Sequence, residues 1–267
     1  MGARMDGETY TPEQVIFVGG APRSGTTLTH ALICTAEDVC DYHAEISFYR
    51  YLIQAYEHGL TYWSVHTEAF FETQDGFRDL VRELSMTTLR RAGAHLGSPK
   101  ILCVKDPMLT PKFPKVAEIH GPEVRFVTVA RHPDDVVRSR QEIHEKTHGP
   151  GSFQAAQVQA VAQEYLQYYA LALTGEYDGR HFSFCYEDIQ NIEMQQRIAD
   201  FCGVPCFDTG KLWQGRQEKA GEATHSPKYG QGIDTGSRLS ALPPEWSALI
   251  ARICGPVMEQ YGYQPRA

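Results

Sequence analysis

The chain has 267 residues, of which 42% are hydrophobic and 22% are charged, and its formal net charge is −8. This length suits one domain, and the composition is that of a folded globular protein rather than a disordered one. The negative charge disfavours nucleic acid, a membrane surface and a long polyanionic acceptor as partners, although it is compatible with a local basic pocket.

No apolar run approaches the roughly 18 residues that a membrane span needs. Residues 1–6 also lack the apolar region of a signal peptide. We therefore expect a cytoplasmic protein with a single domain over residues 1–267 and a flexible start over residues 1–13.

The cysteines favour a reduced protein without a metal. There are seven of them, an odd number, with no C-x-x-C pair, and most lie in apolar runs. Such a pattern is typical of core thiols rather than of disulfides or a zinc site. No cluster of Asp, Glu and His at metal-ligand spacing is evident either, so no metal is expected.

The first motif along the chain is a strand, a glycine-bounded turn and a helix over residues 15–28. Gly20 and Gly25 have the spacing of a P-loop, in which backbone N–H groups and a helix N-terminus bind an anion. A nucleotidase P-loop needs Lys directly after the second Gly, but this chain has Thr26 there and carries its cation at Arg23. The motif therefore predicts an anion site and argues against ATP hydrolysis.

Residues 38–45 interrupt the helical pattern, which resumes over 48–56 and 70–96. The apolar residues of these two segments are expected to form packing faces. Their aromatic residues are expected mainly in the core, with a subset available to line an acceptor pocket: Phe48, Tyr49, Tyr51, Tyr56, Tyr62 and Trp63.

Three further short strands are predicted, over residues 100–104, 124–130 and 181–186. The first ends at Lys105, and the second is followed by Arg131. Alternation of strands with helices predicts an α/β fold with a mostly parallel sheet and helices on both faces. Open sheets of this kind bind their ligands at the carboxyl ends of the strands, where both cations are expected.

The C-terminal part begins with residues 208–240, which are rich in Gly, Lys, Ser and Thr and include Lys228. A loop of this length in a compact domain is usually functional or disordered. A last helix is predicted over residues 245–261 after Pro243 and Pro244.

Four short motifs occur in a fixed order: residues 22–28 (Pro-Arg-Ser-Gly-Thr-Thr-Leu), 105–107 (Lys-Asp-Pro), Arg131 with Ser139, and 186–189 (Tyr-Glu-Asp-Ile). Together they resemble the sulfotransferases that use 3′-phosphoadenosine 5′-phosphosulfate (PAPS), and the resemblance extends over most of the chain. It is nearest to the bacterial and tyrosylprotein-type branch, because the cytosolic enzymes are expected to have Lys where Arg23 stands. The resemblance implies a P-loop-like sulfotransferase architecture, with PAPS as co-substrate and PAP as product.

The resemblance also implies roles for individual residues. The 5′-phosphosulfate would be held by Arg23, Ser24, Gly25, Thr26 and Thr27. Arg131 and Ser139 would hold the 3′-phosphate, and Lys105 would lie near the transferred group, where it and Arg23 would be catalytic. Lys228 would contact the nucleotide. Tyr186 has two interpretations, a nucleotide contact or a core aromatic residue with a satisfied hydroxyl.

A base must take the proton of the acceptor hydroxyl, and family members place a Glu or His for this just after the first helix. Here His43 and Glu45 compete for the role, and the tyrosylprotein-type pattern favours Glu45. The expected acceptor is a small, partly apolar alcohol or phenol, and a peptide tyrosine or a glycan is also compatible.

Two other functions fit parts of the sequence. A P-loop kinase would share the strand, loop and helix, but it should have the missing Lys and a magnesium-binding acid, for which Asp106 is the candidate. A non-catalytic nucleotide-binding protein would keep the phosphate sites without a working base. Binding of PAP, ADP and ATP distinguishes these alternatives.

Overall fold

The computed structural model describes residues 10–174, 177, 179–213, 233 and 241–266. Its centre is a sheet of four parallel strands in the order β2-β1-β3-β4. The strands are β1 (Gln14–Gly19), β2 (Ile101–Lys105), β3 (Val124–Ala130) and β4 (His181–Cys185). The predicted α/β class with a parallel sheet is confirmed.

The strands form where short apolar runs allow burial on both faces of the sheet. Every residue of β2 is buried, as are all but the first of β1 and all but the second of β3. The register pairs Val18 with Lys105 and Ala130 with Cys185, so the strands end close to one level. Residues that follow different strands therefore meet at one edge of the sheet.

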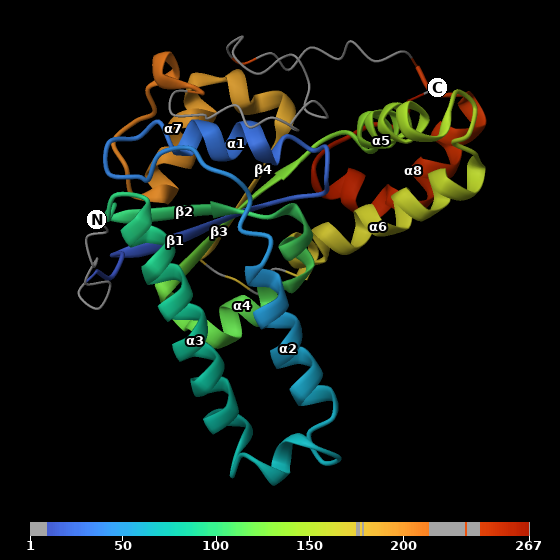
Figure 1. Cartoon of the computed structure of the whole chain (residues 1–267). Helices are drawn as coiled ribbons and strands as arrows, with labels where there is room; N and C mark the ends of the chain where they lie inside the picture. The colour runs from blue at the N-terminus through green and yellow to red at the C-terminus, as the bar shows by residue number, and fades with distance from the viewer. Residues whose placement is uncertain (1–9, 175–176, 178, 214–232, 234–240, 267) are drawn as a thin grey trace.

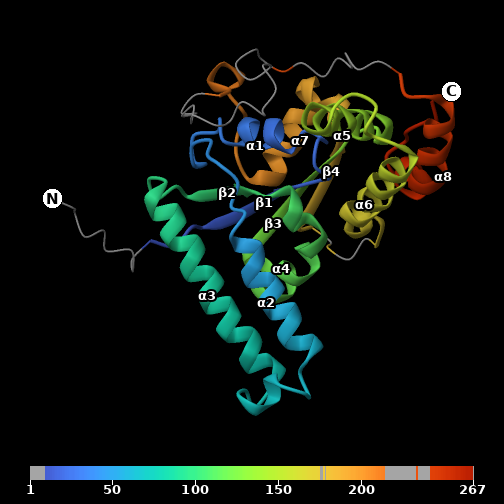
Figure 2. The same cartoon turned by 45° about the vertical axis from the view of Figure 1, so that its right-hand side comes forward.

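Helices cover both faces of the sheet (Figure 1). On one face lie α1 (Thr26–Ile33) and α7 (Ile192–Cys202). On the other lies α4 (Phe113–His120), together with α2 (Tyr49–Thr61) and α3 (Gln74–His95). Helices α2 and α3 run beyond the sheet as a projecting hairpin, which is also visible in Figure 2.

A second group of helices packs beside the sheet and supports its carboxyl edge. It consists of α5 (Pro133–His148), α6 (Ala155–Thr174) and α8 (Pro244–Gln260), which share an apolar core of their own. From α6, Tyr165 donates a hydrogen bond to the carbonyl of Arg131 at 2.8 Å. Tyr169 donates to the carbonyl of Val129 at 2.9 Å and accepts from the N–H of Ala21 at 3.2 Å. These tyrosines fix the end of β3 against the turn that follows β1.

The expectation that the apolar residues of α2 and α3 form packing faces is only partly correct. Leu80 and Leu84 of α3 are exposed. Of the aromatic residues expected in the core, Tyr49 and Tyr56 are buried, whereas Phe48 and Tyr51 are 57% and 60% exposed. Part of α3 extends past the sheet and has no second layer to bury its outer apolar side chains, which accounts for the exposure of Leu80 and Leu84. The helical spacing alone does not reveal this.

The predicted flexible start, residues 1–13, and the predicted loop 208–240 lie largely outside the described residues. Of residues 1–13, the structure describes 10–13, where Tyr10 donates a hydrogen bond to the carbonyl of Pro99 at 2.8 Å and Glu13 N–H to that of Lys100 at 2.9 Å. The loop 208–240 is described only at 208–213 and 233, so the predicted contact of Lys228 lies outside the described part. Among all the described residues of the chain, no helix has the length and apolar character required to cross a membrane.

Candidate active site at the carboxyl edge of the sheet

All four strands deliver a predicted site residue to the same edge. The glycine-bounded turn follows β1, and Lys105 is the last residue of β2. Arg131 comes directly after β3, and Tyr186 directly after β4. In the strand order β2-β1-β3-β4, β2 lies on one side of β1, and β3 and β4 lie on the other. The strand order therefore reverses at β1, and open α/β sheets bind ligands at such a switch point.

The turn after β1 opens the N-terminus of α1 toward this edge. Gly25 is the N-cap residue at φ 103°, and no side chain caps the helix. Arg23 also has a positive φ, 79°, a conformation that few residues other than glycine adopt. The first turn of α1 contains no acidic residue, so its backbone N–H groups and positive dipole end remain available to an anion.

Both glycines of the turn are required by close packing. A Cβ atom on Gly25 would clash with the ring of Tyr186, and one on Gly20 would clash with the carbonyl oxygen of Val129. The turn therefore lies directly against the ends of β3 and β4. Tyr186, with its two interpretations from sequence, forms part of the wall of the turn.

A second cation, Arg131, lies at the same edge of the sheet. The guanidinium of Arg131 stands over the Tyr186 ring at 4.9 Å from its centroid. Arg23 Nε donates a hydrogen bond to the Ser139 hydroxyl of α5 at 3.0 Å. The residues predicted for the two phosphate sites thus come from separate motifs and are in contact in the structure.

Arg131 keeps its positive charge available because its neighbouring acid is occupied. Asp135 accepts hydrogen bonds from Arg266 at 2.7 and 3.1 Å, whereas Arg131 Nε lies 3.8 Å from the Asp135 carboxylate. Burial raises the pKa of Asp135, but the hydrogen bonds from Arg266 and the nearby Arg131 charge outweigh it, and the net pKa is lowered. Sequence reasoning missed Arg266, since it lies 131 residues from Asp135.

Lys105 joins the end of β2 to both the turn and the loop 38–45. Its side chain is 4% exposed, and its Nζ donates to Thr27 Oγ1 at 3.0 Å and to Glu45 Oε1 at 2.7 Å. The Glu45 side chain is 45% exposed, so one of the two candidate bases is accessible from solvent next to the turn.

His43, the other candidate base, has both ring nitrogens next to backbone carbonyls. Its Nδ1 lies 2.8 Å from the carbonyl of Ala44 and its Nε2 lies 2.9 Å from the carbonyl of Cys103. Burial lowers the pKa of His43, but interactions with Cys40 and these two carbonyls outweigh it and raise the pKa above its usual 6.5. Since carbonyl oxygens only accept, the ring is suited to donating at both nitrogens rather than to taking a proton.

Asp106, the acid that a magnesium-dependent kinase would use, is engaged elsewhere. Its side chain is fully buried, forms an ion pair with Arg50 at 3.2 Å and accepts a hydrogen bond from the N–H of Met108 at 3.0 Å. Burial raises the pKa of Asp106 despite the opposing charge of Arg50. The carboxylate is thus satisfied inside the protein.

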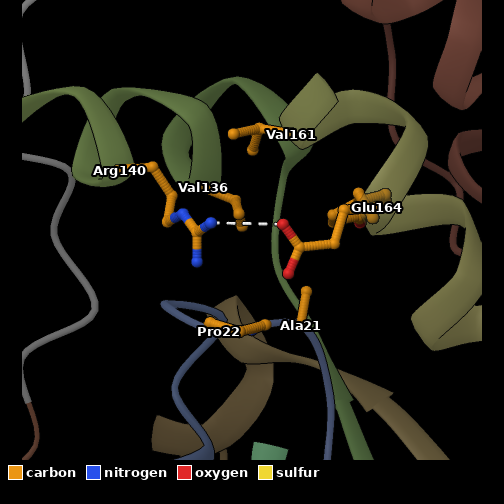
Figure 3. A pocket seen from close by; sticks show the side chains of 7 residues that line it. Ala21, Pro22, Val136, Arg140, Val161 and Glu164 are labelled. Atoms are coloured by element: carbon orange, nitrogen blue, oxygen red, sulfur yellow. Dashed lines mark hydrogen bonds and ion pairs between the residues drawn. The ribbon is translucent and has the colours of Figure 1, made fainter. Parts of the chain in front are cut away.

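A small pocket lies between the turn and helices α5 and α6 (Figure 3). Ala21 and Pro22 form one side, and an ion pair from Arg140 Nη2 to Glu164 Oε2, 3.1 Å long, spans it. The described residues that line it include none of the predicted site residues. We therefore regard this pocket as part of the packing that supports the turn and not as part of the anion site.

Comparison with known proteins places this geometry in a family. The sequence profile of the Sulfotransferase family matches residues 14–209. A search of curated protein sequences found no match to the chain.

Solved structures share the fold. The sulfotransferase domain from the curacin biosynthetic pathway is 18% identical, with 97% of this chain and 100% of that chain covered and a TM-score of 0.62. Sulfotransferase STF9 from Mycobacterium avium is 13% identical, with 97% and 79% covered and a TM-score of 0.55. The sulfotransferase domain of the Synechococcus PCC 7002 olefin synthase is 15% identical, with 92% and 96% covered and a TM-score of 0.50. These likenesses establish the architecture, and the profile, which spans more than half of the sequence, establishes that the chain belongs to the sulfotransferase family.

Proposed function

We propose that the protein transfers a sulfuryl group from PAPS to a hydroxyl group of a small, partly apolar acceptor by in-line displacement. The observation that carries this proposal is the adjacency of two cationic sites at one sheet edge. One is the turn with Arg23 and the N-terminus of α1, and the other contains Arg131 and Ser139. A donor with phosphate groups at both its 5′ and 3′ positions would use both sites, whereas ADP or ATP would leave the second without a partner.

The residues present fit such a donor. The N-terminus of α1 has no side-chain cap, and Arg131 Nε is buried without a hydrogen-bond partner within the described residues. Any side chain at Gly25 would fill the space between the turn and Tyr186. We assign the 5′-phosphosulfate to Arg23, the backbone N–H groups of residues 24–27 and the hydroxyls of Ser24, Thr26 and Thr27. Arg131 and Ser139 are assigned the 3′-phosphate.

PAPS, when bound, supplies the sulfuryl group and a phosphate as its leaving group. Negative charge grows on the leaving phosphate oxygen during transfer, so fixed backbone N–H groups and cations at this point lower the barrier. Arg23 lies within the turn, and Lys105 bonds Thr27 at the start of α1. They would stabilise the transition state more than the bound ground state.

We assign the base to Glu45. Its carboxylate is accessible, and it is held by Lys105, which also bonds Thr27 at the start of α1. Taking the acceptor proton neutralises Glu45 and weakens its attraction for Lys105. The ammonium then becomes available to the negative charge developing beside Thr27. This sequence of steps couples deprotonation of the acceptor to stabilisation of the leaving group.

Exposed apolar side chains follow both members of this pair along the sequence. Phe48 and Tyr51 follow Glu45 at the start of α2, Met108 follows Lys105 shortly after β2, and all three are exposed. Apolar side chains next to a polar reacting group are typical of sites for small organic ligands. They support an alcohol or phenol with an apolar body as the acceptor.

The test is transfer of a labelled sulfuryl group from PAPS to a panel of alcohols, phenols, tyrosine peptides and glycans, read as product mass. We expect a mass gain of one sulfuryl group on a small apolar alcohol or phenol, with release of PAP. Binding of PAP without any transfer would indicate a non-catalytic nucleotide-binding protein. A preference for ATP with magnesium over PAP would indicate a kinase instead.

A further inference from the structure

A group of thiols and imidazoles outside the proposed reaction gathers where α1, the loop 36–45 and β2 meet. His30 lies on α1 and Cys34 follows one turn later, while Cys103 is the middle residue of β2. Cys40 joins them from the loop, where its thiol lies 3.3 Å from both the N–H and the carbonyl oxygen of Cys103. We call these four residues the thiol–imidazole cluster.

Three members of the cluster have the spacing of a metal site. The ligand atoms of His30, Cys34 and Cys103 all lie within 4.8 Å of one another. In a tetrahedral zinc site with Zn–S distances of about 2.3 Å, neighbouring sulfurs are about 3.8 Å apart. Side-chain adjustments of about 1 Å would therefore bring the three ligand atoms to coordination distance.

His30 provides an independent observation, a buried polar atom without a partner. Its side chain is fully buried, and Nε2 lies 3.2 Å from the carbonyl of Cys103. Its Nδ1 is buried without a hydrogen-bond partner within the described residues. A neutral imidazole binds a metal ion through a ring nitrogen that has no other partner.

Cys40 lies next to two of these three residues. Its thiol interacts with that of Cys34, and the N–H of Cys103 donates to its sulfur. A donor of this kind stabilises a metal-bound thiolate.

We propose that His30, Cys34, Cys40 and Cys103 bind one zinc ion. Three sulfurs and one imidazole nitrogen form a ligand set typical of structural zinc and disfavour magnesium or calcium, which prefer oxygen. The ion would join the loop 36–45 to α1 and to β2. Glu45 lies five residues after Cys40, so the ion would fix the loop from which the proposed base extends.

Zinc content and cobalt spectroscopy of the full chain test this proposal. Protein purified from zinc-supplemented cells should carry about one equivalent of zinc after extensive dialysis. Replacement of zinc by Co²⁺ should give thiolate-to-cobalt charge transfer and the visible absorption of a tetrahedral ion. Less than about 0.1 equivalent of zinc together with no such absorption, in protein shown by circular dichroism to be folded, would overturn the proposal.

Variants locate the ion within the chain. Cys34→Ala and Cys103→Ala should each weaken zinc binding by more than about 100-fold. Cys202→Ala is the matched control, since Cys202 is an equally buried thiol on α7. Zinc bound equally well by all three variants would contradict this location. Should the cluster variants not fold, the wild-type measurements decide the question alone.

Alkylation of the denatured chain without reductant adds an independent measurement. Seven free thiols are expected once zinc has been removed, one for each cysteine in the sequence. Two fewer, with a crosslink between cluster peptides, would identify a disulfide and contradict the metal site. Each of these readouts is independent of sulfuryl transfer, so they remain decisive even if the proposed reaction is wrong.

Discussion

At the scale of single residues, Lys105 is the side chain that contacts both the proposed base and the anion-binding turn. One ammonium group bonds both the carboxylate of Glu45 and the hydroxyl of Thr27. His43, two residues before Glu45, faces the carbonyls of Ala44 and Cys103 instead. The two candidate bases are therefore distinguished by what their polar atoms contact.

The first prediction concerns the base. Glu45→Gln keeps the size of the side chain but cannot accept the acceptor proton, so kcat should fall by roughly 10²–10⁴. PAP affinity should stay within about twofold, because Glu45 is not assigned a contact with the nucleotide. Steady-state kinetics with calorimetry measures both quantities. Near-normal turnover in Glu45→Gln, with a collapse in His43→Gln, would transfer the role to His43.

The second prediction concerns Arg266, which holds the Asp135 carboxylate by two hydrogen bonds, so that Arg131 approaches it only to 3.8 Å. Arg266→Gln should let Asp135 bind Arg131, and PAP affinity should fall by about 5- to 20-fold, which corresponds to about 1–2 kcal/mol. Arg252→Gln, an exposed arginine of α8, is the control. In an Asp135→Asn background, Arg266→Gln should have little effect. An equal loss in both backgrounds would show that Arg266 acts by another route.

At the scale of elements, the turn after β1 depends on the close approach of Tyr186. Gly25→Ala should weaken PAP binding at least about tenfold, because its Cβ displaces the turn and the first N–H groups of α1. Gly97→Ala is a matched control, since Gly97 has a similar φ of 91° but no atom near the added Cβ. Both variants should lose about 1 kcal/mol of stability from backbone strain. Loss of PAP affinity in both, or in neither, would contradict this account of the turn.

The sequence predicts features that depend on neighbouring residues better than features that depend on residues far apart in the chain. The strands and the turn are local patterns, and residues 14–19 and 101–105 form strands close to the expected positions. Helix α6 lacks a clear apolar period and was not predicted, although its tyrosines support the site.

Contacts between distant segments were the main omission. The His30 and Cys34 pair has a helical i, i+4 spacing that the sequence displays, but Cys103 joins it only through the packing of α1 on β2. The link from Asp135 to Arg266 likewise depends on how the C-terminal end packs against α5. No local pattern encodes either contact.

At the scale of the whole molecule, buried histidines make stability depend on pH. Burial, with a smaller effect of the Arg82 charge, lowers the pKa of His120 to about 4. Its Nε2 lies 2.7 Å from the Tyr49 hydroxyl and 3.0 Å from the Ser85 hydroxyl, so the buried ring is hydrogen-bonded. Its neutral form is preferred there because burial penalises the charged form. The unfolded chain binds a proton near pH 6.5, so this contribution to stability is complete above pH 6.5 and is lost as the pH falls toward 4.

Urea unfolding at pH 7 and pH 5 measures this effect. The wild-type protein should lose about 2 kcal/mol from His120 over this range, and His120→Gln should lose correspondingly less. His66→Gln, which replaces an exposed histidine, serves as the control. A pH dependence unchanged in His120→Gln would contradict the buried neutral state of this ring.

The central claim is that the sheet edge holds a nucleotide with two separate phosphate sites, and the affinities of PAP and AMP test it most directly. These ligands differ only by the 3′-phosphate assigned to Arg131 and Ser139. Isothermal titration calorimetry should find PAP bound about 10- to 100-fold more tightly than AMP by the wild-type protein. In Arg131→Ala this ratio should approach one, with AMP affinity nearly unchanged. Equal affinities for PAP and AMP in the wild-type protein, or a ratio unaltered by Arg131→Ala, would contradict the claim.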